Sequence, residues 1–390
     1  MSAVAKKPAE KRLLLSGNHA AAWGARLARP KVVPVYPITP QTPILELMTE
    51  FHAAGELDAE FLTPESEHSV MAACIPASLT GVRVFTATAS QGLMLMHEKL
   101  HYASGARAPI VMVNVNRTIA SPWAFWPDQT DSIAQRDTGW IQFYVESAQE
   151  ALDTVVQAFR IAEQAMLPAM ISLDAFYVSH SLEPVAIPSQ ALVDAYLPPY
   201  APEHFIDPQR GESWGNVATQ DMYYRHRQAI GEAMNGSLAL AAGADRAWQD
   251  LTGRGWGLIE RYRCEEADLV ILTMGSMCGT AREAVDALRE DGQKVGLVKL
   301  RLFRPLPGAE LRRALAGVRD VLVLDRNFSP GVGGALNQEL RAALYGMERA
   351  PRVHGYLAGV GGVNVPPEKI VEFCASARSS RDAGEPVWAR

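Results

Sequence analysis

The sequence predicts an α/β protein made of two units, each with a parallel sheet covered by helices. Short apolar runs that suit buried strands alternate with longer segments in which apolar residues recur at helical spacing. A stretch with many prolines, residues 182–211, separates the two series. The 390 residues are enough for two or three domains, and a hydrophobic content of 48% is enough for sizeable cores.

The charge balance and the apolar runs exclude some classes of protein. There are 37 Lys and Arg residues against 43 Asp and Glu, and this net charge of −6 argues against a nucleic-acid-binding protein. No apolar run reaches the length of a membrane span. Residues 1–12 are rich in lysine and alanine and lack the apolar core of a signal peptide. We therefore expect a disordered lead-in to a cytoplasmic protein.

The cysteines argue against a metal centre held by this chain alone. The four are Cys74, Cys264, Cys278 and Cys374, and no two of them form a Cys-x-x-Cys pair. None lies near a pair of histidines. Zinc sites and iron–sulfur clusters need such spacings, so we expect no metal ligands in this chain.

The first unit is predicted over residues 13–181. Ser16 or Asn18 can cap its first helix, which ends before Pro30. The predicted strands are 31–35, 60–64, 82–88, 110–115, 142–145 and 169–173, and the predicted helices are 20–28, 41–54, 70–80, 93–104 and 148–165. Alternation of this kind indicates a parallel sheet with both faces covered. The long stretch 118–139 has no predicted element, and loops of that length are usually functional or form an interface.

Residues 182–265 are predicted to join the two units. The proline-rich part is expected to be an extended linker, and one or two amphipathic helices follow within residues 220–257. The second unit, residues 266–390, is smaller. Its predicted strands are 269–272, 294–300, 321–324 and 353–357, and its predicted helices are 280–289, 311–315, 334–345 and 366–374.

Polar side chains follow four consecutive strands of the first unit. Thr39 follows the first strand, Glu67 the second, Ser90 and Gln91 the third, and Arg117 the fourth. The carboxyl ends of parallel strands lie at one edge of the sheet, where α/β proteins bind ligands. Thr39 or Glu67 alone would most simply cap its helix, and Arg117 alone would be a solvated charge. Together they predict a common site.

Residues 88–92 allow a different chemistry. Thr88-Ala89-Ser90-Gln91-Gly92 comes close to the Gly-x-Ser-x-Gly turn of serine hydrolases, in the same strand–turn–helix context. Thr88 stands in place of the first glycine, and no histidine is obviously placed to act as the base. A hydrolase using Ser90 stays open as an alternative. The glycine-rich runs 331–334 and 359–362 do not match a dinucleotide fingerprint and are predicted to be tight turns.

Several motifs resemble one family when they are taken together. They are residues 36–40 (YPITP), 65–69 (ESEHS), 86–92, 95–98, 113–117, 135–142 (QRDTGWIQ), 270–276 and 301–305. Nearly the whole chain, in one order, resembles the α subunit of pyruvate:ferredoxin oxidoreductase, or pyruvate synthase, in the 2-oxoacid:ferredoxin oxidoreductase family.

This resemblance implies a fold, a reaction and partners. The first unit would be the pyrimidine-type domain of a thiamine-diphosphate enzyme, and the second a transketolase C-terminal-like domain. The reaction would be the CoA-dependent oxidative decarboxylation of pyruvate to acetyl-CoA and CO₂, with ferredoxin as electron acceptor, or its reverse. A β subunit would share the thiamine diphosphate and supply Mg²⁺, and γ and δ subunits would complete a complex whose partners carry the [4Fe–4S] clusters. This chain agrees, because it lacks a Gly-Asp-Gly segment followed by an Asn-bearing stretch.

The resemblance also implies roles for the residues of the predicted site. Glu67 matches the family glutamate that hydrogen-bonds the aminopyrimidine ring of the cofactor, and Ser90 and Gln91 fall in a cofactor-binding turn. Thr39 and Arg117 match the groups that hold the substrate carboxylate, which suits a guanidinium fork. A 2-oxoglutarate enzyme is the alternative within the family. Such enzymes tend to have Gly-Pro-Gly at positions 90–92 and a glycine-rich run at 118–123.

Overall fold

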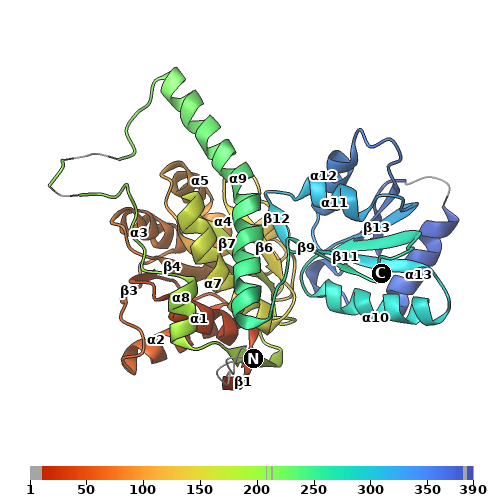
Figure 1. Ribbon diagram of the computed structural model, residues 1–390, viewed down its shortest axis with the longest axis horizontal. Helices are drawn as coiled ribbons and strands as arrows, with labels where there is room; N and C mark the ends of the chain where they lie inside the picture. The colour runs from red at the N-terminus through yellow and green to blue at the C-terminus, as the bar shows by residue number, and fades with distance from the viewer. Residues whose placement is uncertain (1–10, 208, 212–213, 381–383, 390) are drawn as a thin grey trace, which may run out of the picture.

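The computed structural model describes residues 11–207, 209–211, 214–380 and 384–389 (Figure 1). Most of the predicted lead-in, residues 1–10, lies outside the described residues. The chain forms two α/β units, and the strands within each sheet are mostly parallel. The predicted fold class is therefore confirmed.

The sheet of the first unit places strands from distant parts of the chain side by side. Its strands are β2 (Val32–Pro34), β3 (Glu60–Leu62), β4 (Phe85–Thr88), β5 (Val111–Asn116), β6 (Ile141–Val145), β7 (Ala169–Asp174) and β12 (Leu302–Arg304). Five of them pair in the order β12-β6-β7-β5-β4, and a parallel bridge from Val32 to Val84 attaches the β2–β3 pair beside β4. All neighbours are parallel except β12, which comes from the second unit and runs antiparallel to β6.

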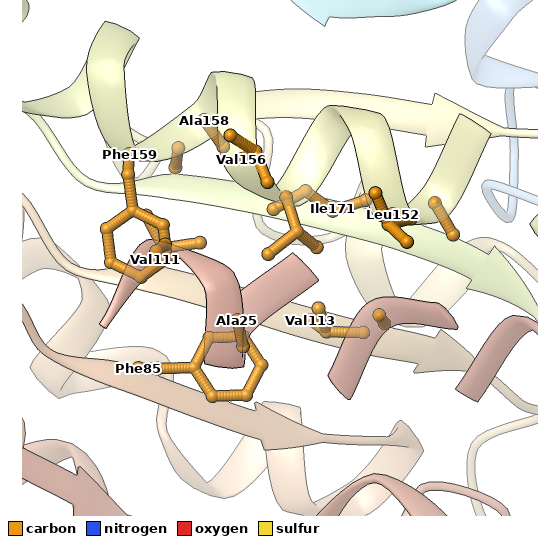
Figure 2. Close-up of a cluster of buried hydrophobic side chains, with 14 of the residues drawn as sticks. Ala25, Phe85, Val111, Val113, Leu152, Val156, Ala158, Phe159 and Ile171 are labelled. Carbon is orange, nitrogen blue, oxygen red and sulfur yellow. The ribbon is translucent and has the colours of Figure 1, made fainter. Parts of the chain in front are cut away.

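Helices cover both faces of this sheet. They are α1 (Gly17–Ala28), α2 (Thr42–Ala53), α3 (Glu67–Leu79), α4 (Ser90–Leu95), α5 (His97–Gly105), α6 (Thr130–Ile133) and α7 (Ala148–Ala165). Along β5, Val111 and Val113 pack with α1 and α7, as Figure 2 shows, whereas Met112 packs with α3 and α5. Successive side chains of a strand point to opposite faces, so an unbroken apolar strand serves two cores.

The second unit is a six-stranded sheet in the order β15-β14-β13-β10-β11-β9. Its strands are β9 (Ile259–Tyr262), β10 (Leu269–Thr273), β11 (Val295–Leu300), β13 (Asp320–Asp325), β14 (Arg352–Ala358) and β15 (Val387–Ala389). Its helices are α10 (Met277–Glu290), α11 (Gly308–Ala314), α12 (Ala335–Leu344), η1 (Val360–Gly362) and α13 (Pro367–Ser379). Side chains of α10 and α13 share one core, and those of α11 and α12 share another.

The prediction of an extended linker after residue 181 is wrong for its first part. Strand β8 (Leu182–Ile187) pairs antiparallel with β1 (Lys11–Ser16), and helix α8 (Gln190–Tyr196) follows, capped by Ser189. Lys11 and Arg12, expected in a disordered lead-in, belong to β1. A strand pair of this kind tolerates Pro184, because each of its strands has a free edge that needs no N–H donor.

One long helix, α9 (Gln220–Thr252), forms where one or two helices were predicted before the second unit. Its last turns pack on the first unit through Ala241, Ala244 and Trp248, which are buried. Its first turns project beyond the rest of the chain in Figure 1, and Tyr223 and Tyr224 there are exposed. No helix of the described part of the chain is long and apolar enough to cross a membrane.

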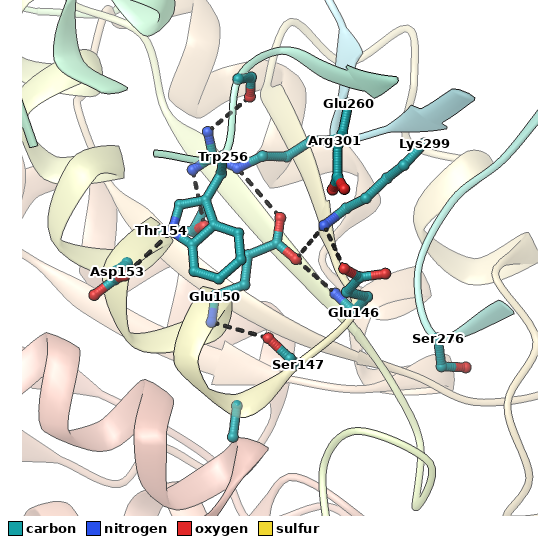
Figure 3. Close-up of polar contacts among 12 residues, drawn as sticks. Glu146, Ser147, Glu150, Asp153, Thr154, Trp256, Glu260, Ser276, Lys299 and Arg301 are labelled. Carbon is teal, nitrogen blue, oxygen red and sulfur yellow. Dashed lines mark hydrogen bonds and ion pairs between the residues drawn. The ribbon is translucent and has the colours of Figure 1, made fainter. Parts of the chain in front are cut away.

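A buried ionic cluster joins the two units, as shown in Figure 3. Lys299 at the end of β11 is fully buried and contacts Glu146 Oε1 at 3.1 Å and Glu150 Oε2 at 2.7 Å, both from the first unit. Arg301 follows and lies 3.5 Å from Glu150 Oε1 and 3.4 Å from Asp245 Oδ1. Burial would lower the pKa of Lys299, but Glu150 and Glu146 outweigh it and raise that pKa.

Candidate active site

The sheet order brings the four predicted turns together. Strands β3, β2, β4 and β5 are neighbours in that order, so the turns that hold Glu67, Thr39, Ser90 and Arg117 share one edge. The chain moves outward from β2 to β3 and in the opposite direction from β4 to β5. Ligands of open α/β sheets bind where the strand order reverses in this way.

Glu67 is the first residue of α3 but does not cap it. Ser66 is the N-cap, and its hydroxyl accepts a hydrogen bond from the Ser69 N–H at 3.4 Å. Glu67 is 8% exposed, and no described residue forms a hydrogen bond or ion pair with its carboxylate. A Cβ atom on Gly92 would lie 2.6 Å from Glu67 Oε1, so only glycine leaves room for this carboxylate. Glu67 is therefore free to bind a donor on a ligand.

Arg117 is a buried cation that forms no ion pair with a described carboxylate. Its side chain donates from Nη1 to the Thr39 carbonyl at 2.6 Å and from Nη2 to Gln91 Oε1, and its Nε has no partner among the described residues. The guanidinium lies 5.1 Å from the ring centre of Trp123 and 5.8 Å from that of Phe125. Burial lowers the pKa of Arg117, and the charges of Asp131 and Glu67 oppose this shift. No carboxylate of the described residues pairs with it, so an anionic ligand would complete the site.

Thr39 lies beside Arg117 and is exposed. The N-cap position of α2 belongs to Gln41, so the simple capping role considered for Thr39 is wrong. The Thr39 carbonyl is bonded to Arg117, whereas its hydroxyl has no hydrogen bond to a described residue. The hydroxyl can therefore donate to the same anion as Arg117.

Ser90 does not have the surroundings of a serine nucleophile. It is fully buried, and its hydroxyl lies within hydrogen-bond distance of the Thr118 carbonyl and Gln91 Oε1. No histidine of the described chain hydrogen-bonds to it. Its backbone has φ +48°, an unusual value outside glycine, as in a sharp strand-to-helix turn. The buried hydroxyl argues against the hydrolase alternative.

Asp131 lies at the centre of the site, although its sequence context gave it no role. Its buried carboxylate accepts hydrogen bonds from the N–H groups of Ser90 at 3.0 Å and Arg117 at 3.3 Å. The side-chain amides of Asn114 and Asn116 donate to it at 3.1 and 2.6 Å. Burial raises the pKa of Asp131 to about 7, against the effect of these bonds. The one available sign was the pair of asparagines in an otherwise apolar strand.

The second unit meets the first next to this edge. Asp174, at the end of β7, accepts hydrogen bonds from Ser276 Oγ at 2.7 Å and from Arg326 Nη1 at 2.8 Å. The predicted tight turn at 359–362 contains Gly362 at φ +80°, and a Cβ there would lie 2.4 Å from Trp126 Cβ. The loop after Arg117 is therefore packed against the second unit.

Two family models match most of the chain. The model described as pyruvate flavodoxin/ferredoxin oxidoreductase, thiamine diphosphate binding, matches residues 23–241, and the one described as pyruvate:ferredoxin oxidoreductase core domain II matches residues 267–370. The strands that carry the four turns fall within the first match.

Curated relatives align over nearly the full length. The pyruvate synthase subunit PorA of Methanothermobacter thermautotrophicus is 48% identical over 362 residues, which is 92% of this chain and 94% of the relative. The ketoisovalerate oxidoreductase subunit VorA of Pyrococcus horikoshii is also 48% identical, over 90% of this chain and 89% of the relative.

Solved structures share the fold at low sequence identity. The 2-oxoglutarate:ferredoxin oxidoreductase from Magnetococcus marinus has a TM-score of 0.74 and 22% identity, covering 95% of this chain. This chain spans 66% of the length of that one. A split-gene transketolase has a TM-score of 0.53, 14% identity and coverage of 93% of this chain and 98% of its own. The family models and the relatives together confirm the predicted family: the chain belongs to the pyruvate flavodoxin/ferredoxin oxidoreductase family.

Proposed function

We propose that this chain is the α subunit of a thiamine-diphosphate-dependent pyruvate:ferredoxin oxidoreductase. The reaction is the CoA-dependent oxidative decarboxylation of pyruvate to acetyl-CoA and CO₂, or its reverse. The observation that carries the proposal is the buried Arg117 guanidinium, which has no carboxylate partner among the described residues and lies next to the free hydroxyl of Thr39. A 2-oxoacid carboxylate supplies the missing anion and accepts from both groups.

The surroundings of Glu67 fit the aminopyrimidine end of thiamine diphosphate. The carboxylate is nearly buried, has no partner among the described residues and lies against the space left by Gly92. It would hold a proton at a ring nitrogen. When bound, thiamine diphosphate supplies the electron sink for cleavage of the bond to the departing carboxylate. Gln91 Oε1 is taken by Arg117, which leaves the amide nitrogen to donate to the cofactor, and Ser90 shapes the turn.

Exposed apolar side chains support a partner subunit over this edge. Leu62 ends β3, and Tyr36, Leu95, Trp123 and Phe125 come from the segments after β2, β4 and β5; each is between 36% and 51% exposed. Patches of this kind mark interaction sites. A β subunit would dock here with the diphosphate and Mg²⁺ site. The γ and δ subunits would carry the [4Fe–4S] clusters that pass electrons to ferredoxin. We place the complex in the cytoplasm, where the four free cysteines would stay reduced.

The relatives leave two candidate substrates in the same chemical class. PorA and VorA relatives are equally identical to this chain, so a branched 2-oxoacid such as ketoisovalerate is the second candidate after pyruvate. The turn Ser90-Gln91-Gly92 differs from the Gly-Pro-Gly of 2-oxoglutarate enzymes, which argues against 2-oxoglutarate.

The test is the activity of the chain purified together with its partner subunits. Reduction of ferredoxin or a viologen dye is followed with CoA and either pyruvate, ketoisovalerate or 2-oxoglutarate. We expect CoA-dependent reduction, with the highest kcat/KM for pyruvate. A higher kcat/KM for ketoisovalerate would make ketoisovalerate, and not pyruvate, the preferred 2-oxoacid. No CoA-dependent reduction with any of the three would overturn the proposed function.

A further inference from the structure

Five hydrogen bonds converge on one buried carboxylate beneath the candidate site. Asp131 Oδ2 accepts from the N–H of Ser90, the side chain of Asn114 and the N–H of Arg117, at 3.0, 3.1 and 3.3 Å. Asp131 Oδ1 accepts from the side chain of Asn116 at 2.6 Å and from the N–H of Ser132 at 2.7 Å. The donors come from the turn after β4, from β5 and the residue that follows it, and from α6.

The carboxylate holds two chain segments that must lie in a fixed relation. Ser90 N–H belongs to a residue at φ +48°, a conformation that is unfavourable for a residue with a side chain and needs support from its surroundings. Arg117 N–H belongs to the residue whose guanidinium is bonded to Gln91 Oε1 and the Thr39 carbonyl. The contacts thus run from Asp131 through both turns to Thr39.

We propose that Asp131 is a positioning residue for the substrate-binding groups: its buried carboxylate fixes the turn that carries Gln91 relative to the strand end that carries Arg117. The expected effect of this role on the KM for the 2-oxoacid rests on the proposed function. Its structural consequence, protection of two backbone N–H groups, does not depend on what the site binds.

The chemistry of the five donors requires a carboxylate. Every donor to Asp131 points an N–H at one of its two oxygens, and a carboxylate accepts on both. The amide of asparagine accepts on one atom only and donates from the other. Asp131→Asn therefore keeps the shape and leaves two or three of the N–H groups facing a donor. Groups left unpaired in this way in a buried site are costly.

A matched control exists in the second unit. Asp325 is also fully buried at a strand end, and it also accepts from two backbone N–H groups, those of Leu336 at 2.9 Å and Asn337 at 3.0 Å. Its contacts all lie within the second unit and none reaches the four turns. Asp325→Asn is the same change of chemistry at a carboxylate that makes no hydrogen bond of its own to the four turns.

The first measurement is hydrogen exchange by mass spectrometry on the assembled complex without substrate. In Asp131→Asn, peptides that cover Ser90 and Arg117 should exchange about tenfold or more faster, because an unmade hydrogen bond no longer protects the amide. Peptides around Leu336 should be unchanged. In Asp325→Asn, peptides around Leu336 should exchange faster and those that cover Ser90 and Arg117 should be unchanged. Exchange at Ser90 and Arg117 equal in wild type and Asp131→Asn would overturn the positioning role.

The second measurement is steady-state kinetics with the preferred 2-oxoacid. Asp131→Asn should raise its KM about 10- to 100-fold with a smaller loss of kcat, because the carboxylate-binding groups are displaced. The KM for CoA should be unchanged. A loss of kcat alone, or a KM for the 2-oxoacid no higher than in Asp325→Asn, would contradict the proposal. If the wild-type complex acts on no 2-oxoacid, the proposed function fails, and the exchange experiment still decides the role of Asp131.

A second variant covers the case in which Asp131→Asn does not fold. Asn114→Leu removes a single donor to Oδ2, the oxygen shared by Ser90 and Arg117, and it also removes the Asn114 amide oxygen, which has no partner among the described residues. It should also speed exchange at Ser90 and Arg117 and raise the KM for the 2-oxoacid, both by less than Asp131→Asn. Wild-type exchange and wild-type KM in Asn114→Leu, together with an unfolded Asp131→Asn, would reduce Asp131 to a folding role and overturn the proposal.

Discussion

Glu67 is the residue whose role can be separated most clearly from stability. Because Ser66 caps α3, Glu67→Gln should leave the fold intact. In the assembled complex it should slow exchange of the thiazolium C2 proton of bound thiamine diphosphate, measured by NMR. A general acid–base contribution is typically about 10²–10⁴-fold. Glu65→Gln, two residues earlier on the exposed side of the same turn, is the control and should exchange as wild type. Wild-type exchange in Glu67→Gln would remove Glu67 from the mechanism.

Arg117 and Thr39 should act as a clamp for the substrate carboxylate. Arg117→Ala should raise the KM for pyruvate by an amount equivalent to about 2–5 kcal/mol, the usual cost of truncating one partner of a buried charge pair. Arg117→Lys should raise the KM for pyruvate less than Arg117→Ala does, because lysine keeps the charge but not the fork. Thr39→Val should raise it by an amount equivalent to roughly 0.5–1.5 kcal/mol, the usual value of one hydrogen bond. Arg107→Ala is the control. That side chain is partly buried and donates to the carbonyls of Met166 and Ala165, away from the site.

The clamp also predicts what should not change. Pyruvate and 2-oxobutyrate share the carboxylate and differ at the far end. Arg117→Ala should therefore lower kcat/KM by the same factor for both. A variant that alters the ratio of the two kcat/KM values while the KM for pyruvate stays at the wild-type value would place these residues at the methyl end.

The sequence predicted the residues that follow strands and missed Asp131, which accepts hydrogen bonds from two of them. Thr39, Glu67, Ser90 and Arg117 were recognisable because each lies in the turn after a predicted strand. Asp131 is separated from Ser90 by 41 positions and from Arg117 by 14, and it reaches them only because the loop after β5 folds back beneath the sheet edge. No local pattern reports a contact of that kind.

Strand β13 offers a test at the scale of a single element, because its two end residues should respond to pH in opposite directions. Burial raises the pKa of Asp325 to about 6, above its ordinary value of 3.8. Burial alone would also raise the pKa of Asp320, but hydrogen bonds from Arg352, Arg319 and His354 lower it below 3.8. The two substitutions Asp325→Asn and Asp320→Asn therefore form a matched pair on one strand.

The opposite pH dependences of stability follow from how tightly each folded carboxylate binds its proton. Folded chains bind the Asp325 proton more tightly than unfolded chains, so the stability that Asp325 contributes is present below about pH 4 and is lost as the pH rises through 6. The free energy of unfolding of wild type minus that of Asp325→Asn should fall by about 3 kcal/mol over that range. For Asp320→Asn the same difference should fall as the pH drops below about 4. Urea unfolding from about pH 2 to 7 measures both differences, and equal slopes would contradict the assignment.

Elements with a clear period were predicted well, and those set by distant pairing were not. The helix predicted at 148–165 is α7 (Ala148–Ala165), because its amphipathic pattern alone defines it. The short strands β9, β12 and β15 were missed, since each is an edge strand of three or four residues recruited by backbone pairing. The helix predicted at 93–104 divides at Met96 into α4 and α5.

The buried ionic cluster should be important for the whole molecule, because it fixes one unit against the other. Lys299→Met leaves the buried Glu150 and the partly buried Glu146 with one cation fewer, and breaking such a pair typically costs about 3–5 kcal/mol. Adding Glu150→Gln should recover part of this loss, because one of the uncompensated carboxylates is removed. Urea unfolding of the single and double variants measures the effect. A loss under 1 kcal/mol in Lys299→Met would show that the cluster does not hold the units together.

The isolated chain should contain only half of the catalytic site. On the proposed function it would offer groups for the pyrimidine ring and for a substrate carboxylate, whereas its sequence has no Gly-Asp-Gly motif for diphosphate and Mg²⁺. Two cavities of about 770 and 740 Å³ in the described chain are lined by other residues than those of the four turns. We therefore expect calorimetry to show weak or no binding of thiamine diphosphate and Mg²⁺ by the chain alone, and no 2-oxoacid turnover.

The same titration with the partner subunits present should give tight binding, and Glu67→Gln should weaken it. A fluorophosphonate should not label Ser90 in either preparation, because its hydroxyl is buried and bonded to the Thr118 carbonyl. Tight binding of thiamine diphosphate by the isolated chain would mean that the diphosphate is held by residues with no recognisable motif, and the shared site would then be wrong. Labelling of Ser90 would instead support the serine hydrolase alternative, since only an activated, accessible serine reacts with that reagent.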